Sequence, residues 1–392
     1  MAQHPDINQA TLAFIRQHAN EDVRKLALQG SKNPDVDIAY ALNQIAGRQK
    51  AKTKIPSWAA IDGIIYPPHI SMEQCSSEAT ARYKAKIAGK GQKLIDLTAG
   101  FGVDMAFMSA NFSQAVHVEQ QEALCAISSN NYAHLGLHHV NVVCCDGVEY
   151  LHQLDHADLI FIDPARRNEH GGRTYGIADC TPNVMEIIDE MLEKSTRVMI
   201  KLSPMLDWQK AVSDIGHISE VHIVSVGNEC KELLLIAERK ECPLKIYCVN
   251  DDQIFSYETS GEIKTFYNKP SSPQYLYEPN ASIMKAGCFS LLSQQFGISQ
   301  PDANSHLFLS EQKLTTFPGR EFAIERICSL NKRELKSALS GITKANIAVR
   351  NFPLSADELK KKLKLKDGGD VYIFATTDTQ KGHLLLVCRK IS

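Results

Sequence analysis

The feature that most constrains the fold is an alternation of short apolar runs with segments of helical periodicity, which begins near residue 92. The runs KLIDLTA, AVHVEQ, VNVVCCD, ADLIFID and RVMIKLS are each followed by such a segment. This βαβα alternation predicts an α/β fold with a parallel sheet and helices on both faces. The last two runs, EVHIVSVGN and KELLLIAER, leave no room for a crossover helix, so we expect an antiparallel hairpin there.

Prolines and changes in the residue pattern divide the rest of the chain into segments. Residues 8–50 predict two amphipathic helices and residues 71–88 a third, with a proline-containing loop between them. After residue 242, short strand-like runs, a Pro/Ser-rich connector (KPSSPQYLYEPN) and one helix (SIMKAGCFSLLSQQFG) follow. Residues 319–392 alternate strand, helix, strand and helix before two final strands. We therefore expect additional small α+β parts at the C-terminal end.

Composition limits the classes of protein and of site. The 392 residues include 43 Lys and Arg against 45 Asp and Glu, so the average surface indicates no polyanionic partner. No run approaches the roughly 20 apolar residues that cross a bilayer, and the first residues do not resemble a signal peptide. The eleven cysteines form no C-x-x-C pair, which gives zinc or disulfide chemistry no support. We expect a cytoplasmic protein with reduced thiols, no membrane and no metal.

A strand, a glycine turn and a helix in IDLTAGFGVD mark the first candidate ligand site. Gly100 and Gly102 allow a tight turn close to a ligand, and the helix behind them presents free N–H groups. Met105 stands where a dinucleotide fingerprint has its third glycine, and Asp96 would repel a pyrophosphate. A carboxylate there suits the ammonium group of S-adenosylmethionine. The candidate cofactor-binding residues of this turn are Asp96, Thr98, Gly100, Gly102 and Asp104.

Acidic residues also end the next three predicted strands. They are Glu119, Asp146 and Asp163. The carboxyl ends of parallel strands meet at one sheet edge, so these carboxylates should face one crevice. There Glu119 can accept from the ribose hydroxyls and Asp146 from the adenine amino group, although Asp146 alone could simply be a helix N-cap. The adjacent candidate cofactor-binding residues are Gln120 and Gly147.

The fourth predicted strand ends in Asp163-Pro164-Ala165-Arg166-Arg167. The acid-proline pair resembles the (D/N)-P-P-(Y/F) motif of enzymes that methylate exocyclic amines. Acceptors for the two N–H groups of the amine would align its lone pair with a methyl donor, so we expect Asp163, Pro164 and Arg166 to be catalytic. Because Arg166 replaces the aromatic residue, either its guanidinium stacks on a base or the target is not a flipped base. Arg166 and Arg167 are candidate substrate-binding residues, or else they pair with acidic neighbours.

Phrases from nearly the whole chain carry a family resemblance. They are LNQIAGRQKAKTKIPSWAA, EQCSSEATARYKA, DLTAGFGVD, DPARRN, KLSPMLD, NECKELLL and VRNFPLSADELKKKLKLKDGG. They resemble a bacterial family of class I S-adenosylmethionine-dependent methyltransferases with a C-terminal THUMP-like domain. The resemblance implies a Rossmann-like fold with a mostly parallel, seven-stranded sheet and an antiparallel last strand. It implies four parts: a helical region over 1–70, the methyltransferase domain over 71–241, a small ferredoxin-like domain over 242–318 and a THUMP-like domain over 319–392.

Three segments near the crevice add candidates. In related methyltransferases the segment before the first strand crosses the cofactor's methionine end, where hydroxyl and amide groups suit a carboxylate. The candidates there are Gln74, Ser76 and Ser77, with an ordinary polar helix start as the alternative. Lys201 and Ser203 follow the fifth strand, and Asn228 lies in the hairpin turn, which either faces the substrate or is a plain turn.

Residues 331–366 carry ten Lys and Arg and three acids, a net charge of +7. A cationic end on a mildly acidic chain is typical of an appended RNA-binding module, whose phosphate contacts supply affinity without sequence choice. The alternative is a solvated lysine-rich helix. The candidate RNA-binding residues are Lys332, Lys360, Lys361 and Lys364.

These patterns favour an S-adenosylmethionine-dependent methyltransferase that acts on a base nitrogen of RNA. One alternative keeps the cofactor and takes a protein or a small molecule as substrate. A second is a non-catalytic RNA-binding protein with a vestigial cofactor pocket, which the intact acids at four strand ends oppose. An NAD-linked dehydrogenase is disfavoured by Met105 and by the terminal hairpin.

Overall fold

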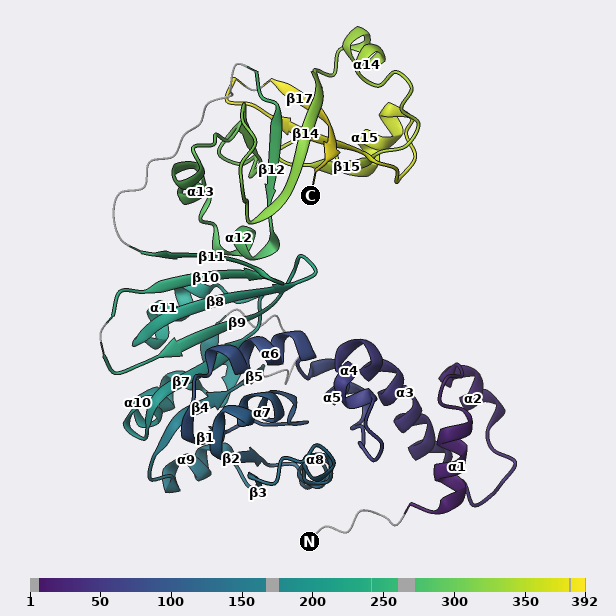
Figure 1. Ribbon diagram of the computed structural model, residues 1–392, viewed down its shortest axis with the longest axis vertical. Helices are drawn as coiled ribbons and strands as arrows, with labels where there is room; N and C mark the ends of the chain where they lie inside the picture. The colour runs from purple at the N-terminus through teal and green to yellow at the C-terminus, as the bar shows by residue number, and fades with distance from the viewer. Residues whose placement is uncertain (1–6, 167–175, 241, 260–271, 381, 392) are drawn as a thin grey trace. The chain divides into compact units, whose positions relative to one another are not determined.

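The computed structural model describes residues 7–166, 176–240, 242–259, 272–380 and 382–391 (Figure 1). Its contacts separate two compact units. The first runs to His222 and also contains Lys231–Lys245, and the second contains Ile223–Cys230 and the chain from Ile246 onward. The four-part division of the chain at residues 70, 241 and 318 stays a prediction.

Six helices precede the first strand within residues 7–90. They are α1 (Gln9–Gln17), α2 (Val23–Gln29), α3 (Ile38–Lys54), α4 (Pro56–Ala59), α5 (His69–Gln74) and α6 (Glu78–Ile87). The first predicted helix is in fact two, because the Asp22 side chain accepts from the N–H groups of Arg24 and Lys25 and starts α2. The third is also two, since Ser77 caps α6. The proline-containing loop holds α4 and the first residues of α5.

The larger of the two main sheets has the predicted connectivity. Its strands are β1 (Gly91–Asp96), β2 (Phe112–Glu119), β3 (Val140–Cys144), β4 (Ala157–Ile162), β7 (Ser195–Leu202), β8 (Ile218–Val226) and β9 (Glu229–Ala237). They lie in the order β8-β9-β7-β4-β1-β2-β3. The pairs β1–β2, β2–β3, β1–β4 and β4–β7 are parallel, whereas β9 runs antiparallel to β7. This order and the reversed β9 confirm the Rossmann-like class I prediction.

The sheet has nine strands rather than the predicted seven. The two additional strands, β10 (Lys245–Asn250) and β11 (Gln253–Glu258), follow β8 at its free edge. The β8–β9 hairpin would otherwise leave the outer N–H and C=O groups of β8 unpaired. The N–H of Asp251, just after β10, donates to the carbonyl of Ser225 on β8 at 3.1 Å. The short strand-like runs predicted after residue 242 include these two strands.

Helices cover both faces of the parallel strands in the first unit (Figure 1). They are α7 (Val103–Met108), continued by the short η1 (Ser109–Asn111), α8 (Glu122–His134), α9 (Gly147–Gln153), α10 (Val184–Glu193) and α11 (Trp208–Ile215). One apolar cluster joins Trp58 of α4, Met105 of α7 and Ile127 of α8 to Phe161 and Met199 of the sheet. This packing fixes the strand ends from which the site is built.

The second unit contains a six-stranded sheet in the order β13-β12-β14-β17-β16-β15. Its elements are β12 (Tyr275–Pro279), α12 (Ala281–Ala286), α13 (Phe289–Phe296), β13 (Phe308–Ser310), β14 (Gly319–Cys328), α14 (Lys332–Ala338), β15 (Asn346–Val349), α15 (Ala356–Leu363), β16 (Val371–Thr377) and β17 (His383–Lys390). The predicted Pro/Ser-rich connector contains β12, because Leu276 and Tyr277 are buried between β13 and β14. The predicted helix over 282–297 breaks at Gly287, which has φ +72°. One of the strand-like runs predicted after residue 242, EIKTFYN, lies entirely outside the described residues.

Candidate functional site

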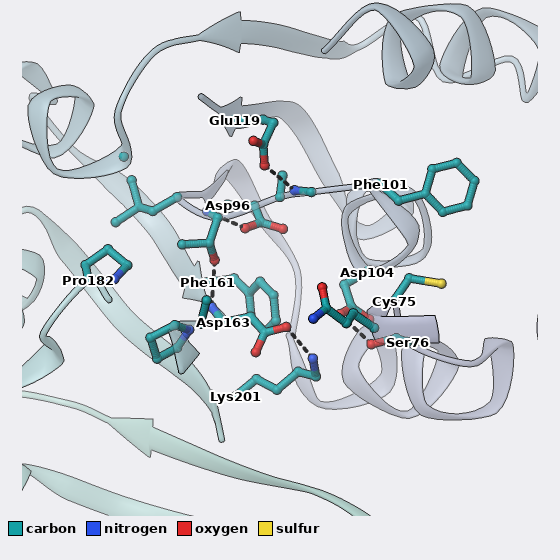
Figure 2. A pocket seen from close by; sticks show the side chains of 18 of the residues that line it. Cys75, Ser76, Asp96, Phe101, Asp104, Glu119, Phe161, Asp163, Pro182 and Lys201 are labelled. Atoms are coloured by element: carbon teal, nitrogen blue, oxygen red, sulfur yellow. Dashed lines mark hydrogen bonds and ion pairs between the residues drawn. The ribbon is translucent and has the colours of Figure 1, made fainter. Parts of the chain in front are cut away.

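A cavity of about 660 Å³ opens at the carboxyl edge of the parallel strands in the first unit. The turn after β1 and the ends of β2, β4 and β7 form its inner wall, and Ser71 with residues 74–76, 180–182 and 231–232 completes it. Strand carboxyl ends are where sheets of this class bind ligands. Figure 2 shows the side chains that converge on this cavity.

Hydrogen bonds hold three strand ends together around the glycine turn. The Asp96 carboxylate accepts from the N–H of Thr98 at 3.0 Å, and the Thr98 hydroxyl oxygen accepts from the N–H of Asp163 at 2.7 Å. Gly100, with φ +55°, donates its N–H to Glu119 at 3.0 Å. The turn therefore links β1 to both β2 and β4, and Asp96, Thr98 and Gly100 all line the cavity.

Two glycines are required by close packing. Gly102 has φ +82°, and a Cβ there would lie 2.2 Å from the Tyr132 hydroxyl; a Cβ on Gly147 would lie 2.2 Å from the carbonyl oxygen of Leu97. Gly147 lines the cavity, whereas Gly102 does not. Behind Gly102, the Tyr132 hydroxyl lies 2.7 Å from Nδ1 of His117, and burial lowers the pKa of His117 to about 3. Gly102 thus lets the turn pack on a neutral buried pair.

The carboxylates of Glu119 and Asp146 hold backbone N–H groups. Glu119 is buried, and its second oxygen accepts from the N–H of Gln121 at 2.8 Å. One oxygen of Asp146 accepts from Val148 and Glu149 at 2.8 and 3.1 Å, so Asp146 is the N-cap of α9. Both acids nevertheless line the cavity, and Gln120 does too. The capping alternative and a ligand role for Asp146 are therefore compatible.

Asp163 forms an ion pair with Lys201 (Figure 2). Burial opposes a charge on Lys201, but the carboxylates of Asp163, Asp104 and Glu232 outweigh it and raise the pKa of this lysine. Lys201 is therefore a cation at neutral pH and cannot act as a general base. The ammonium group of Lys201 already forms the ion pair with Asp163. The substrate-binding role of Lys201 stays a prediction and would have to operate alongside this ion pair.

The segment after Asp163 forms a short two-stranded ribbon. β5 (Ala165–Arg166) pairs with β6 (Cys180–Thr181), and η2 (Ile177–Asp179) precedes β6. Pro164 is buried and lines the cavity, and Pro182 lines it from the β6 side (Figure 2). The backbone of Arg166 belongs to β5, but its side chain and the whole of Arg167 lie outside the described residues. Sequence reasoning missed residues 180–182, because nothing in their composition signals contact with the site.

The serines before β1 have internal partners. The Ser76 hydroxyl donates to Asp104 at 2.7 Å and accepts from Nζ of Lys84 at 3.1 Å. The single hydroxyl proton of Ser76 is therefore already donated to Asp104. Ser77 accepts from the N–H of Thr80 at 3.3 Å as the N-cap of α6, and it does not line the cavity. Gln74, Ser76 and Asp104 do line it.

A fully buried lysine beneath this wall was not predicted. Nζ of Lys84 lies 2.6 and 2.7 Å from the two carboxylate oxygens of Glu232 and 3.1 Å from Asp104. Burial raises the pKa of Glu232, while Lys84 and Lys201 oppose that rise. In the sequence Lys84 looks like any other helix lysine. The sequence feature that could have indicated a buried charged group is Glu232, which lies inside the apolar run KELLLIAER.

The remaining candidate residues are spread over both units. Ser203 lines the cavity, and its hydroxyl accepts from the N–H of Met205 at 3.3 Å. Asn228 belongs to the second unit and does not line the cavity; its side-chain oxygen accepts from the N–H of Ala281 at 2.8 Å. The Asn228 side chain therefore ties the β8–β9 turn to α12, and its substrate-binding role stays a prediction.

The predicted RNA-binding lysines lie on α14 and α15 of the second unit. Lys332 opens α14 and is exposed, and Lys361 and Lys364 are exposed near the end of α15. Lys360 instead pairs with Asp357 at 3.0 Å and Asp367 at 2.7 Å. It is therefore the least available of the four for a phosphate.

Two absences hold for the described part of the chain. No group of three or more His, Cys, Asp and Glu residues is arranged to hold a metal ion in the residues covered by the structure. None of the helices described is both long enough and apolar enough to cross a membrane.

Comparison with known proteins adds family evidence to this geometry. Residues 319–390 match the THUMP domain-like family model and residues 275–318 a ferredoxin-like domain model. The crystal structure of a putative methyltransferase from Porphyromonas gingivalis W83 is similar over 98% of this chain and 99% of that chain, with 30% identity and a TM-score of 0.87. The chain belongs to this methyltransferase family. The predicted resemblance, fold class and C-terminal domain types are thereby confirmed.

Two more distant similarities each cover less than half of this chain. The ribosomal RNA small subunit methyltransferase J of Legionella pneumophila is 31% identical over 83 residues, which is 19% of this chain. The chain spans about a third, 34%, of the length of that relative. A putative methyltransferase from Streptococcus mutans in complex with SAH is 15% identical over 41% of this chain and 96% of its own, with a TM-score of 0.30. A likeness at that level supports no conclusion about this chain.

Proposed function

We propose that this family member is an S-adenosylmethionine-dependent methyltransferase that methylates a base nitrogen of RNA. The observation that carries the proposal is the position of Asp163. It lies at the end of β4, is paired with Lys201, and lines the same cavity as the glycine turn and the acids of β1 and β2. A methyl donor and an acceptor amine need to meet in one such place.

The residues present fit the cofactor. The cavity volume is in the range of small-molecule sites, and Asp96 is a buried carboxylate with no ion-pair partner among the described residues. Asp96 would hold the ammonium group, Glu119 the ribose hydroxyls and Asp146 the adenine amino group. When bound, the cofactor supplies an electrophilic methyl group on a sulfonium.

The chain's own contribution would be to orient the acceptor. Lys201 donates a hydrogen bond to one oxygen of Asp163, Oδ2. The other oxygen can accept one N–H of the target amine, and the Pro164 carbonyl can accept the second. These two acceptors would hold the nitrogen so that its lone pair points at the methyl donor. The displaced N–H proton would pass to solvent.

Three observations support RNA as the substrate. The C-terminal residues match a THUMP domain-like model, and residues 331–366, which include α14 and α15, have a net charge of +7. A curated relative is named as a ribosomal RNA methyltransferase. The cavity wall is acidic, so a neutral base can enter it far more easily than a phosphate, and the phosphates would be bound elsewhere.

A protein or small-molecule substrate is the second candidate. It is favoured by the absence of an aromatic residue after Asp163-Pro164, where Ala165 and Arg166 stand. The cavity wall near Asp163 is formed instead by Pro164 and Pro182. An apolar wall of this kind accepts flat groups of several chemical classes.

Transfer of a labelled methyl group distinguishes the candidates. Purified protein and methyl-labelled S-adenosylmethionine are incubated separately with total RNA, protein extract and small-molecule extract from a strain lacking the gene. We expect label in RNA, and its loss with Asp163→Asn. Asp158→Asn is the matched control, since Asp158 lies at the opposite end of β4, where one of its oxygens accepts from the N–H groups of Gln92 and Lys93. Label in protein or in small molecules, with none in RNA, would reject RNA as the substrate.

A further inference from the structure

Two exposed apolar side chains stand at the edge of the cavity. The large apolar side chains that the first unit exposes are Leu28, Ile70, Met185 and Met205. Ile70 is 66% exposed and precedes Ser71. Met205 is 81% exposed and stands between Pro204 and Leu206. These three neighbours line the cavity, whereas the chain neighbours of Leu28 and Met185 do not. A single exposed apolar residue is ordinary, but Ile70 and Met205 border a binding cavity.

A hydrogen-bonded turn after β7 keeps Met205 in this exposed position. The Ser203 hydroxyl accepts from the N–H of Met205 at 3.3 Å, and the Ser203 carbonyl accepts from the N–H of Leu206 at 3.1 Å. Pro204, between them, has a fixed φ. Asp207 follows directly as the N-cap of α11. The exposure of Met205 is therefore a property of an ordered turn.

Two lysines of α3 lie beside α5, the helix that carries Ile70. Nζ of Lys54 lies 2.9 Å from the carbonyl oxygen of Met72 and 2.6 Å from that of Glu73. Nζ of Lys50 lies 2.9 Å from the Glu73 carboxylate. Two ammonium groups thus share one carboxylate, which leaves a positive surplus next to Ile70.

These lysines lie near the end of the cavity that contains Asp163 and Lys201. Burial lowers the pKa of Lys54, and the charge of Lys201 lowers it further, while Cys75 and Glu73 oppose this. Cys75 and Lys201 both line the cavity. The basic rim therefore adjoins the place where the acceptor amine would sit.

An acceptor at Asp163 needs an apolar surface beyond the one already described. Ala165 and Arg166 stand where an aromatic residue would stack on it, and Pro164 and Pro182 supply one apolar wall. A nucleobase binds best when its flat faces leave water against apolar side chains. Exposed apolar groups at the edge of this end of the cavity can provide the missing surface.

We propose that Ile70 and Met205 form an apolar lip that packs on the nucleobase to be methylated, and that Lys50 and Lys54 bind the phosphate beside it. This inference rests on the proposed function and gives the substrate as a nucleotide within RNA. Charge complementarity favours a nucleotide, because the acidic cavity accepts a neutral base while the basic rim attracts a phosphate. The lip and the rim both belong to the first unit, as the cavity does.

Kinetics on the full chain with RNA and labelled S-adenosylmethionine test the lip. Ile70→Gln and Met205→Gln should each raise KM for RNA roughly 10-fold, by the same factor at low and high salt. The affinity for the cofactor, measured by calorimetry, should not change. Met205→Leu keeps an apolar surface and should retain a KM close to wild type. Leu28→Gln and Met185→Gln make the same kind of change away from the cavity and are the matched controls.

Salt dependence tests the rim separately. Lys50→Gln should lower the log–log salt slope of kcat/KM by roughly 0.7–0.9 units, as for one lost phosphate contact. Lys52→Gln is its control, because Nζ of Lys52 lies 2.7 Å from the Asn20 side-chain oxygen and has no contact with α5 among the hydrogen bonds described.

The outcomes separate this inference from the proposed function. Wild-type protein that methylates RNA, with the KM values of both lip variants equal to those of the controls, overturns the lip. An unchanged salt slope in Lys50→Gln overturns the phosphate contact. Wild-type protein that transfers no methyl group to RNA overturns the proposed function and this inference together.

Discussion

The cavity of the first unit and the basic helices of the second unit use charge in opposite ways. In the cavity, carboxylates are buried at strand ends and fixed by hydrogen bonds and by Lys84 and Lys201. On α14 and α15, lysines such as Lys332 and Lys361 extend into solvent. Buried charges cannot move without large cost, whereas exposed ones adapt to many partners and are screened by salt. The first arrangement suits selection of one ligand and the second suits a polyanion of variable sequence.

Removing Lys84 should show how strongly the cavity depends on fixed charge. Lys84→Met leaves the buried Glu232 and the partly buried Asp104 without their cation, and we expect a loss of about 3–5 kcal/mol in the free energy of unfolding. Urea denaturation measures it. The double variant Lys84→Met/Glu232→Gln removes one stranded charge and should recover part of the loss. A change in the single variant no larger than that of Lys362→Met, an exposed helix lysine, would mean that the network is not stabilising.

Asp163→Asn should separate catalysis from cofactor binding. Loss of the carboxylate removes a charged acceptor for the target amine, so kcat should fall by about 10²–10³-fold, with a much smaller change in cofactor affinity. Single-turnover kinetics and calorimetry give the two values. Equal turnover in the variant and in wild type would assign Asp163 a purely structural role with Lys201.

Glu119→Ala should weaken cofactor binding by roughly 1–3 kcal/mol, as expected for the loss of a charged hydrogen-bond partner. The structure adds a second reason, because Glu119 also fixes the N–H groups of Gly100 and Gln121. Glu119→Gln keeps an acceptor for one of these groups and should lose less. Calorimetry with unchanged affinity in both variants would remove Glu119 from the cofactor site.

The basic helices should give the smallest effects, and these should depend on salt. Replacing Lys361, Lys362 and Lys364 with Gln should lower the log–log salt slope of RNA binding by about one or two units, since each lost phosphate contact contributes roughly 0.7–0.9. Lys360→Gln should change it little, because Lys360 already pairs with Asp357 and Asp367. Filter binding at several salt concentrations measures the slope. An unchanged slope in the triple variant would identify this segment as a solvated helix.

The same contrast explains what the sequence could predict. The acids at the ends of β1, β2 and β4 could be located because each follows an apolar run, and topology brings such ends together. The contacts of Lys84 and Pro182 could not, since they depend on how elements distant in sequence pack. The pairing of Ser76 with Asp104 has the same origin. Local patterns give the strands and their ends, while tertiary packing decides which polar groups remain available to a ligand.

Nucleoside mass spectrometry of cellular RNA tests the central claim most directly. RNA is compared from a strain lacking the gene and from the same strain carrying either the wild-type gene or Asp163→Asn. The account predicts one base-methylated nucleoside that is missing in the deletion strain, returns with the wild-type gene and stays missing with Asp163→Asn. Identical methylated-nucleoside profiles in all three strains would contradict methylation of RNA by this protein.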